Sequence, residues 1–438
     1  MPRAETTLIN GYPNKILRWY YVASVIFLLQ AIDAFEIFDR LVYGEWALKS
    51  GDKITESLNL IMIAASLLLF GRAFRRKTIT AGGILALALV CFLLLSALWS
   101  VDPPITVRRG VIYLWFIIGT IGVAGSLDGD EVMDLLAMVC GLSAAATIVL
   151  LVISPSDALL PYSSALRGVF PHKNLFGQVM AIGTLVSVHL IRINRSRRLF
   201  KISVLIMFIV LTFLSKSSTA MLTMSLFCAV NGIVALFRKG GLARILGAFS
   251  IMVLVPTAVI VALNPDSLLE MVGKDPTLSG RTDLWSYLLN YVYERPILGW
   301  GFRAFWSPNN PAVFEISTAV NWTVLSAHNG LLEMLLEGGI VGTAFFLFLW
   351  VRNIVFAGRS INTSEKELGI SSLLFCGAIF LIAISEPVLV EPGILAAVFF
   401  STGLMCERAV RVSRRRRYPT TQRATLRVLP ANAADWVP

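Results

Sequence analysis

The stretch GGILALALVCFLLLSALW, residues 82–99, contains no charged side chain. About 20 apolar residues in a helix are enough to cross the hydrocarbon core of a bilayer, so this stretch predicts a transmembrane helix. The rest of the chain has the same character, because 56% of all residues are hydrophobic, only 15% are charged, and the mean hydropathy is +0.74. Soluble globular domains do not have this composition. The sequence therefore predicts an integral membrane protein.

Apolar runs of similar length recur along the chain and predict an all-α polytopic fold with about twelve transmembrane helices. The expected spans are residues 19–35, 57–73, 82–99, 109–126, 132–153, 174–191, 199–215, 219–237, 245–263, 329–351, 369–386 and 389–406.

Lysines and arginines are concentrated in alternate connections between these runs and in the C-terminal tail, which under the positive-inside rule predicts a multi-pass protein of the cell inner membrane with both termini in the cytoplasm. The net charge of +11 is spread over these short connections, an arrangement that argues against nucleic acid as a partner. The expected organisation is a cytoplasmic tail over 1–18, nine transmembrane helices over 19–263, a periplasmic loop with short helices over 264–328, three further transmembrane helices over 329–406, and a basic cytoplasmic tail over 407–438.

The five cysteines all fall inside apolar runs, an arrangement that argues against both a disulfide framework and a CxxC metal site. They are Cys91, Cys140, Cys228, Cys376 and Cys406.

Polar groups gather at the expected outer ends of the helices. In RGVFPHKNLFG (167–177), Arg167, His172, Lys173 and Asn174 lie within eight positions. Asparagine at a helix start is typical of a cap. The alternative is an anion site, because helix starts carry positive dipole ends and basic side chains stand beside them.

Further outer segments carry similar chemistry. LSKSSTA (214–220) places hydroxyls around Lys216, and Arg281 follows a serine–glycine turn in LSGRTDLW (278–285). The aromatic residues that come next fit either a membrane-surface belt or platforms that stack on sugars. They are Trp285, Tyr287, Tyr291, Tyr293, Trp300 and Trp306.

The segment AHNGLLEMLLEGGIVG (327–342) begins with His328 and Asn329. Asn329, Glu333 and Glu337 recur every four residues and share one helix stripe. A carboxylate inside a span is a functional candidate, while the alternative for Glu337 is a buried pair that ties helices together. The GxxxG spacing of Gly338 and Gly342 is typical of close helix packing.

Three segments in this order, RGVFPHKNLFG, SGRTDLW…PILGWGF and AHNGLLEMLLEGGIVG, resemble the signatures of the O-antigen ligase and Wzy-type polysaccharide polymerase superfamily. The FPHKN motif and the chain length resemble most closely the ExoQ-type exopolysaccharide production proteins. The resemblance covers residues 165–345. Where relatives commonly have an arginine in the SKSSTA turn, this chain has Ser218, and Lys216 supplies a charge without the bidentate geometry of a guanidinium.

The resemblance implies a GT-C-like glycosyltransferase that works at the periplasmic membrane surface without metal or other cofactor. Its implied donor is an undecaprenyl-pyrophosphate-linked oligosaccharide, and its acceptor is a second lipid-linked repeat unit in a polymerase or lipid A–core in a ligase. Membrane lipids, a chain-length regulator and export proteins are the further expected partners. The positions that match the family motifs are Arg281, His328 and Asn174.

The chemistry of such a reaction assigns roles to these residues. Negative charge grows on the departing pyrophosphate, and Arg281 is expected to neutralise it. His328 is expected to accept the proton of the attacking hydroxyl, because an unperturbed imidazole titrates near neutral pH. The expected substrate-binding residues are Arg167, His172, Lys173, Asn174, Lys216, Asn329 and Glu333.

Three alternatives stay open. The acids Asp33, Glu36 and Asp39 in the first outer loop are the one place for a metal or base site, whereas Asp128 and Asp130 fit a helix N-terminal cap better. A polysaccharide transporter or flippase also has about twelve spans, although it would place ionisable residues deep in several of them. The third alternative is a non-catalytic partner in a polysaccharide assembly.

Overall fold

The computed structural model describes residues 15–31, 53–161, 163–193, 196–239, 241, 281–388 and 391–417. Within these residues the chain is helical, and the nearest approach to sheet is one isolated antiparallel bridge between Leu159 and Leu166. The helices are α1 (Lys15–Ala31), α3 (Lys53–Arg75), α4 (Ala81–Leu95) with the 3-10 turn η3 (Ser96–Leu98), α5 (Pro103–Ser126), α6 (Gly129–Ile153), α7 (Pro155–Ala158), α8 (Lys173–Ile193), α9 (Arg198–Leu214), α10 (Ser218–Lys239), α13 (Arg281–Glu294), α14 (Pro311–Ala319), α15 (Gly330–Ser360), α16 (Lys366–Ala383) and α17 (Ile394–Arg417).

Seven of the described helical segments are long and apolar enough to cross a membrane, and the chain is a multi-pass membrane protein. They are Ala81–Leu98, Pro103–Ser126, Gly129–Ile153, Lys173–Ile193, Ser218–Phe237, Gly330–Ser360 and Lys366–Ala383. A shorter apolar helix, Trp19–Gln30, lies within α1. The all-α polytopic fold predicted from sequence is confirmed, whereas the count of twelve stays a prediction. The ninth expected span, 245–263, lies outside the described residues.

Several helix ends differ from the expected ones, among them those of α17 and α16, because the limits of an apolar run are not the limits of a helix. α17 continues past the expected end at residue 406 to Arg417, since arginine is a good helix former and needs no apolar surroundings. α16 ends at Ala383 rather than 386, since Pro387 disfavours helical backbone at the residue before it.

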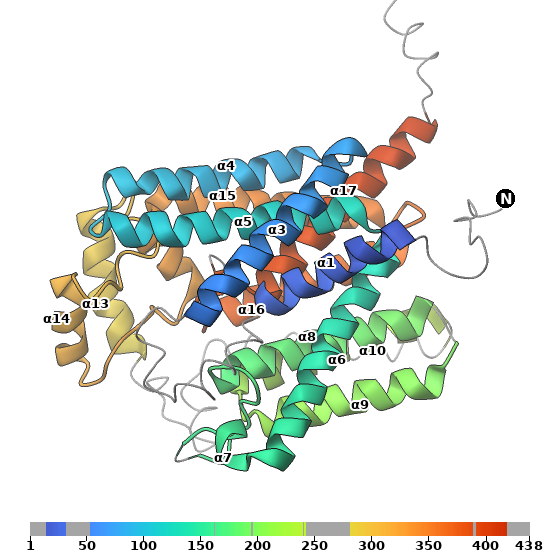
Figure 1. Ribbon diagram of the computed structural model, residues 1–438, viewed down its shortest axis with the longest axis horizontal. Coiled ribbons are helices and arrows are strands. Elements are labelled where there is room, and N and C mark those ends of the chain that lie inside the picture. The colour runs from blue at the N-terminus through green and yellow to red at the C-terminus, as the bar shows by residue number, and fades with distance from the viewer. Residues whose placement is uncertain are drawn as a thin grey trace, which may run out of the picture.

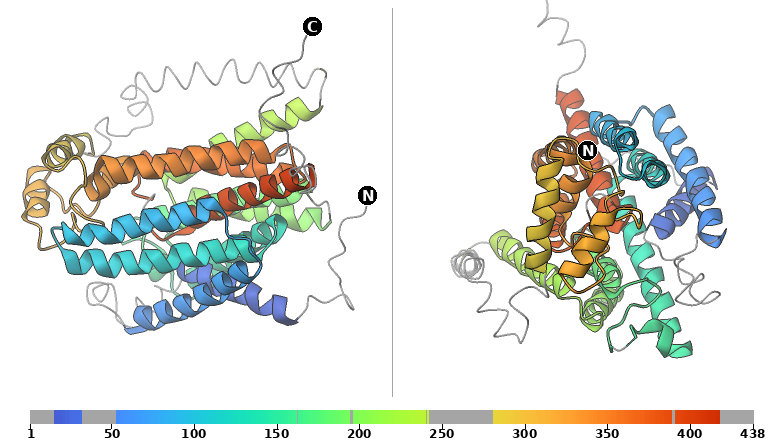
Figure 2. Two further views of the ribbon diagram at one scale, coloured as in Figure 1. Left: turned by 90° about the horizontal axis from the view of Figure 1, so that it is seen from above. Right: turned by 90° about the vertical axis from the view of Figure 1, so that its left-hand side faces the viewer.

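Most helices run side by side along one direction, and α13 and α14 cover one end of this bundle (Figure 1). That end is called the capped end below. The beginning of α1 and the last turns of α17 lie at the opposite end, as Figure 1 and the left view of Figure 2 show.

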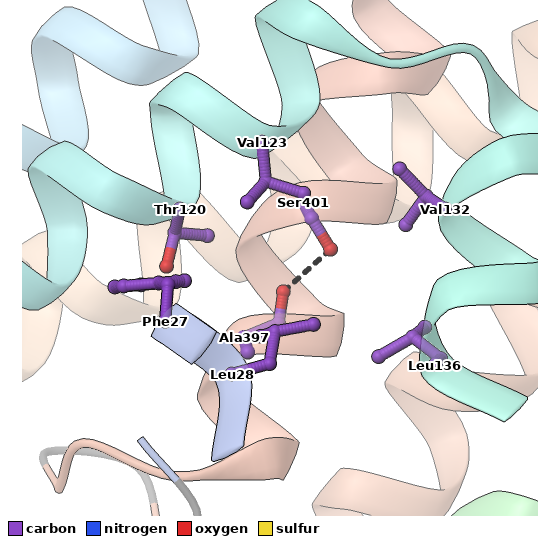
Figure 3. A pocket seen from close by; sticks show the side chains of 8 residues that line it. All are labelled: Phe27, Leu28, Thr120, Val123, Val132, Leu136, Ala397 and Ser401. Atoms are coloured by element: carbon purple, nitrogen blue, oxygen red, sulfur yellow. Dashed lines mark hydrogen bonds between the residues drawn. The ribbon is translucent and has the colours of Figure 1, made fainter. Parts of the chain in front are cut away.

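The helices pack closely where α1, α5, α6 and α17 meet (Figure 3). The hollow there is lined mainly by apolar side chains, and the hydroxyl of Ser401 donates to the backbone oxygen of Ala397 at 2.6 Å. The hydroxyl of Thr120 likewise bonds its own helix, at Phe116 O. Polar groups satisfied within their own helices offer no chemistry, so this hollow is packing.

Aromatic side chains form the core of the capped end. Trp285, Tyr291, Trp300 and Trp306 pack against a buried cluster that includes Leu284, Leu288 and Phe305. The indole nitrogen of Trp285 donates to Ala327 O at 2.9 Å, and that of Trp300 donates to Tyr291 O at 2.9 Å. These four side chains stabilise the capped end by packing inside it. This role differs from the two roles expected from the sequence, a membrane-surface belt and a platform for stacking on sugars. Tyr287 and Tyr293 are exposed.

Hydrogen bonds also fix the cap to the connection between α4 and α5. Asp102 caps α5 by accepting from Ile105 N, and its second carboxylate oxygen accepts from Ser307 Oγ and from Asn309 Nδ2 at 3.0 Å. These hydrogen bonds outweigh burial and lower the pKa of Asp102. Trp300 O accepts from the backbone nitrogen of Val101 at 3.1 Å. The loop that follows α13 is thus held by the bundle itself.

Helix α15 is broken at Gly339, where φ is 60° and ψ is −164°. The backbone groups on both sides of the break bond to the segment 296–301: Ile340 N donates to Pro296 O at 2.8 Å, and Trp300 N donates to Leu336 O at 2.7 Å. Irregular backbone within a span is tolerated where protein supplies such partners. The break therefore holds the capped end against the long helix.

Two other expectations from the sequence, the helix cap at Asp128 and the close packing at Gly338 and Gly342, are confirmed. Asp128 caps α6, and Glu131 reaches back to its backbone nitrogen at 2.9 Å. Gly338 and Gly342 lie against Phe92 and Leu93 of α4, as the GxxxG spacing predicts. All five cysteines are free.

Candidate functional site

Arg281 is the first residue of α13, and its guanidinium faces the turn that follows α16. Its Nη1 donates to Ser385 O at 2.8 Å, and its Nη2 lies 3.7 Å from Oε1 of Glu386. The same carboxylate oxygen accepts a hydrogen bond from Nδ2 of Asn174, in the first turn of α8, at 2.8 Å. Three segments that are far apart in the sequence therefore meet at one carboxylate.

Glu386 is 8% exposed. Burial raises the pKa of its carboxyl to about 7, although the charge of Arg281 and the hydrogen bond from Asn174 act in the opposite direction, while Glu391 adds to the rise. A carboxyl with this pKa exchanges a proton near neutral pH, which is the property of a general base or acid.

His328 lies beside Trp322, with 5.8 Å between the ring centroids, and its backbone is left-handed at φ 48°. Burial, then the charges of Arg281 and His172, lower the pKa of His328 to about 4. The imidazole is therefore neutral near pH 7. Its Nδ1 is buried and makes no hydrogen bond with any residue that the structure describes. This nitrogen is therefore a buried acceptor or donor without a partner among the described residues.

His172 belongs to the same group of side chains, since its charge acts on His328. Its Nδ1 accepts from the backbone nitrogen of Asn174 at 3.2 Å, so His172 caps the start of α8. Asn174, which the sequence suggested as the cap, instead reaches Glu386. Burial, with Lys173 and Arg167 nearby, lowers the pKa of His172.

The turn between α9 and α10 and the start of α10 also reach the site. The hydroxyls of Thr219, in the first turn of α10, and Ser385 are 2.8 Å apart. Gly177 of α8 packs on this turn, because an added Cβ there would lie 2.7 Å from Ser215 Oγ. Lys216 has a left-handed backbone and directs its ammonium to the hydroxyl of Ser164. The turn is therefore part of the site, and its charged group is exposed beside it.

Three of the expected substrate-binding residues, Arg167, Asn329 and Glu333, form hydrogen bonds within the protein. Arg167 is 5% exposed and donates through Nε to Asp157 O at 3.2 Å. Asn329 caps α15 by accepting from the backbone nitrogens of Leu331 and Leu332. Arg167 is thus bound to the backbone of a neighbouring segment and Asn329 to the start of its own helix, and their part in substrate binding stays a prediction.

The third is Glu333, which is fully buried in the first turn of α15. Its Oε1 accepts from the indole nitrogen of Trp306 at 2.5 Å, and its Oε2 accepts from Ala327 N at 2.7 Å. Oε2 thus holds the residue before His328, and Oε1 holds the loop between α13 and α14. The charge of Arg303 in that loop also acts on Glu333.

The sequence reading missed three charged residues: Glu386, Glu391 and Arg303. The two acids lie in SEPVLVEPG (385–393), each followed by proline and set between apolar runs. Acids at the end of a span, followed by helix-breaking prolines, were the available signal. The expected spans 369–386 and 389–406 included both acids within apolar runs, which concealed the signal.

Among the described residues there is no group of three or more histidine, cysteine, aspartate or glutamate side chains arranged to hold a metal ion. Asp33, Glu36 and Asp39, the alternative metal or base site, lie outside the described residues.

Part of the sequence is similar to a known protein family. Residues 176–347 match the O-antigen ligase family. The matched segment contains Lys216, Arg281 and His328, whereas Asn174 and Glu386 lie beyond its two ends.

Two curated relatives are similar to the chain. The exopolysaccharide production protein ExoQ of Rhizobium meliloti (strain 1021) is 24% identical over 362 residues, which are 76% of this chain and 78% of that protein. A protein of Rickettsia prowazekii (strain Madrid E) that is named as a polysaccharide ligase is 31% identical over 91 residues, which are 20% of this chain and 22% of that protein. The resemblance predicted from the three motifs is confirmed.

Proposed function

We propose, from the premise that residues 176–347 match the O-antigen ligase family, that this chain is an inner-membrane glycosyltransferase of exopolysaccharide synthesis. The proposed reaction joins undecaprenyl-pyrophosphate-linked oligosaccharide units at the periplasmic face, as a Wzy-type polymerase does. The long similarity to an exopolysaccharide production protein supports a part in exopolysaccharide synthesis. The single observation that carries the proposal is the meeting of Arg281, Glu386 and Asn174, with His328 close by.

The proposed chemistry is a single inverting displacement. A hydroxyl of the acceptor attacks the anomeric carbon of the donor, the bond between that carbon and the pyrophosphate oxygen breaks, and its electron pair leaves with the pyrophosphate. Arg281 neutralises the charge that grows there. The hydroxyl gives its proton to a protein base, and no metal is required.

Two residues are candidates for handling that proton. The pKa of His328, about 4, makes it a weak base that is uncharged near pH 7 and able to accept a hydrogen bond from the acceptor hydroxyl. The pKa of Glu386, about 7, is closer to the operating pH of a base. We therefore assign orientation of the hydroxyl to His328 and acceptance of the proton to Glu386, in place of the base role first expected for His328.

The ion pair between Arg281 and Glu386 also gives an order for pyrophosphate binding and proton transfer. While Arg281 pairs with Glu386, the carboxylate is partly neutralised. A bound pyrophosphate would draw Arg281 toward itself, because two phosphate groups carry more charge than one carboxylate. Glu386 would then be released to the acceptor hydroxyl.

Replacement of either catalytic residue tests the proposal. Arg281→Ala and His328→Ala are expected to lower the formation of long polymer by about 100-fold or more. Polymer is measured by gel filtration of polysaccharide from cells that carry equal amounts of membrane-inserted protein. Arg108→Ala, which removes an exposed arginine near the start of α5, is the matched control and should retain polymer. Normal polymer from both site variants would refute the assignment.

The lipid-linked intermediates of a deletion strain separate the two activities. Loss of a polymerase leaves single repeat units on the lipid carrier. Loss of a ligase leaves long chains on the carrier, and that result would replace polymerase by transfer to lipid A–core as the function.

A further inference from the structure

An ion pair joins the capped end to the segment that contains Glu386. The guanidinium of Arg303, in the loop between α13 and α14, donates to Oε1 of Glu391. Glu391 follows Glu386 by a few positions and precedes α17. The two charged side chains are only partly buried. An ion pair between partly exposed side chains contributes little to stability, so stability alone does not account for this pair.

The backbone on either side of Arg303 is fixed by the bundle. Gly301 N donates to Glu337 O at 3.1 Å, and Phe302 N donates to Ser96 Oγ at 2.9 Å. Phe302 O accepts from Thr106 Oγ1 at 3.0 Å. Arg303 itself has a left-handed backbone, φ 57°. The backbone that leads to Arg303 is therefore held against η3, α5 and α15, and its guanidinium bonds Glu391.

Arg303 faces several acids there. Burial would lower its pKa, but the charges of Glu391, Glu337 and Glu333 raise it above the ordinary value. Glu333 and Glu337 are fully buried in α15. One cation thus offsets the charge of acids on two different segments, and Glu391 is the one that binds it directly.

The charges around Glu386 can be named element by element. From α13 comes Arg281, from α8 come the neutral amide of Asn174 and the adjacent Lys173, and from the first turn of α10 comes the hydroxyl of Thr219 by way of Ser385. His328, on which the charge of Arg281 acts, and His172 are neutral near pH 7, because the pKa of each is lowered.

Glu391 is the remaining acid whose charge acts on Glu386, and that charge raises the pKa of Glu386. Its ion pair with Arg303 offsets part of this effect.

We propose that Arg303 is a positioning residue for the reaction: through its ion pair it holds Glu391 in place and offsets the negative charge that Glu391 presents to Glu386. The inference rests on the proposed function, in which Glu386 accepts the proton. Arg303 does not contact the reacting groups in this arrangement. It acts through a neighbour that lies outside the family-matched segment.

The charges predict opposite effects for the two members of the pair. Glu391→Gln removes a negative charge near Glu386, so the pKa of Glu386 should fall. Arg303→Gln leaves the charge of Glu391 unopposed, so the pKa of Glu386 should rise. Arg303→Lys keeps the charge and should stay close to the parent protein. Shifts of a few tenths to about one pH unit are expected, the usual scale of such charge effects at partly buried sites.

The experiment is an infrared titration of the full-length protein in lipid nanodiscs. The carboxyl C=O absorption is followed against pH, and the spectrum of the matching Glu386→Gln variant is subtracted to isolate Glu386. The same proteins are then assayed against pH with the lipid-linked oligosaccharide fraction extracted from a deletion strain. The acid limb of the rate profile should move in the same direction as the titration. A bridge with a purely structural role would change the amount of folded protein and leave both midpoints in place.

The outcomes separate the two proposals. Opposite shifts in Glu391→Gln and Arg303→Gln support the inference, while unchanged midpoints or shifts in one common direction overturn it. If Arg303→Gln does not fold, Glu391→Gln alone decides, since glutamine has nearly the shape of glutamate. Full activity of Glu386→Gln would refute its base role in the proposed function, whatever the titration of the other variants shows.

Discussion

The carboxyl of Glu386 has two partners of different kinds. Arg281 stabilises its charged form, while the amide of Asn174 holds one oxygen in place. Burial opposes the effect of both partners and raises the pKa of Glu386 to about 7. The unfolded value for glutamate is about 4.3, so the fold moves this titration into the range where a base is effective.

A pH dependence follows at the residue scale. The raised pKa means that the carboxylate form is present above about pH 7 and is lost as the pH falls through that value. The initial rate of polymer formation by the purified protein should therefore decline on the acid side of about pH 7. Glu386→Gln should remove that limb and lower the rate by about 100-fold or more. Glu294→Gln, at an exposed acid of α13, should leave both rate and profile unchanged. An acid limb that persists in Glu386→Gln would assign it to another group.

Helix α15 shows how one backbone position joins two elements. At Gly339 the chain has φ 60° and ψ −164°, a conformation that is available almost only to glycine. An added Cβ would lie 2.3 Å from Ile297 O, so both the conformation and the space require glycine. The segment 296–301, which leads to Arg303, depends on this break for its hydrogen bonds.

Gly339→Ala is accordingly expected to destabilise the protein by about 1–3 kcal/mol and to lower activity through displacement of the 296–301 segment. The loss of stability is measured by thermal unfolding in nanodiscs, with tryptophan fluorescence as the signal. Gly358→Ala on the same helix is the control, because nothing lies within 4 Å of a Cβ added there. It should leave the unfolding temperature unchanged or raise it slightly. Equal behaviour of the two variants would show that the break is not under constraint.

Much of the helical layout was predictable, because long charge-free runs can satisfy their backbone in lipid only as helices. The break in α15 was not, since GGIVG (338–342) reads equally well as close packing, and that reading is also correct for Gly338 and Gly342. The partners of Arg281 could not be predicted from the sequence, for a similar reason. A contact with a turn about a hundred residues later depends on how the helices pack, which a local pattern does not contain.

At the scale of the whole molecule, a second charged cluster lies at the end of the bundle opposite the cap. Arg352 of α15 pairs with Glu407 of α17 at 2.5 Å, and the backbone nitrogen of Gly82 in α4 donates to the same carboxylate at 3.1 Å. The pair is almost fully buried. Gly82 is needed for close approach, because an added Cβ would overlap the guanidinium. Three helices are thus fixed together far from the site.

Loss of one member of a buried pair leaves the other charge uncompensated, so Glu407→Gln should destabilise the fold by about 3–5 kcal/mol. Arg411→Gln removes an outer, more exposed partner of the same carboxylate and should change stability by about 1 kcal/mol or less. Unfolding midpoints of both variants in one lipid composition provide the comparison. A small effect of Glu407→Gln would show that water or lipid headgroups reach Arg352.

The position of Glu386 in the chain has a consequence for biosynthesis. Arg281 and His328 are made first, and the carboxylate between them and α8 is added only after α15 and α16 have been translated. A nascent chain, or a fragment limited to the family-matched residues 176–347, would carry the arginine and the histidine without their carboxylate. Under the proposed mechanism such a protein lacks the proton acceptor, so polymer formation is expected only when assembly in the membrane is nearly finished.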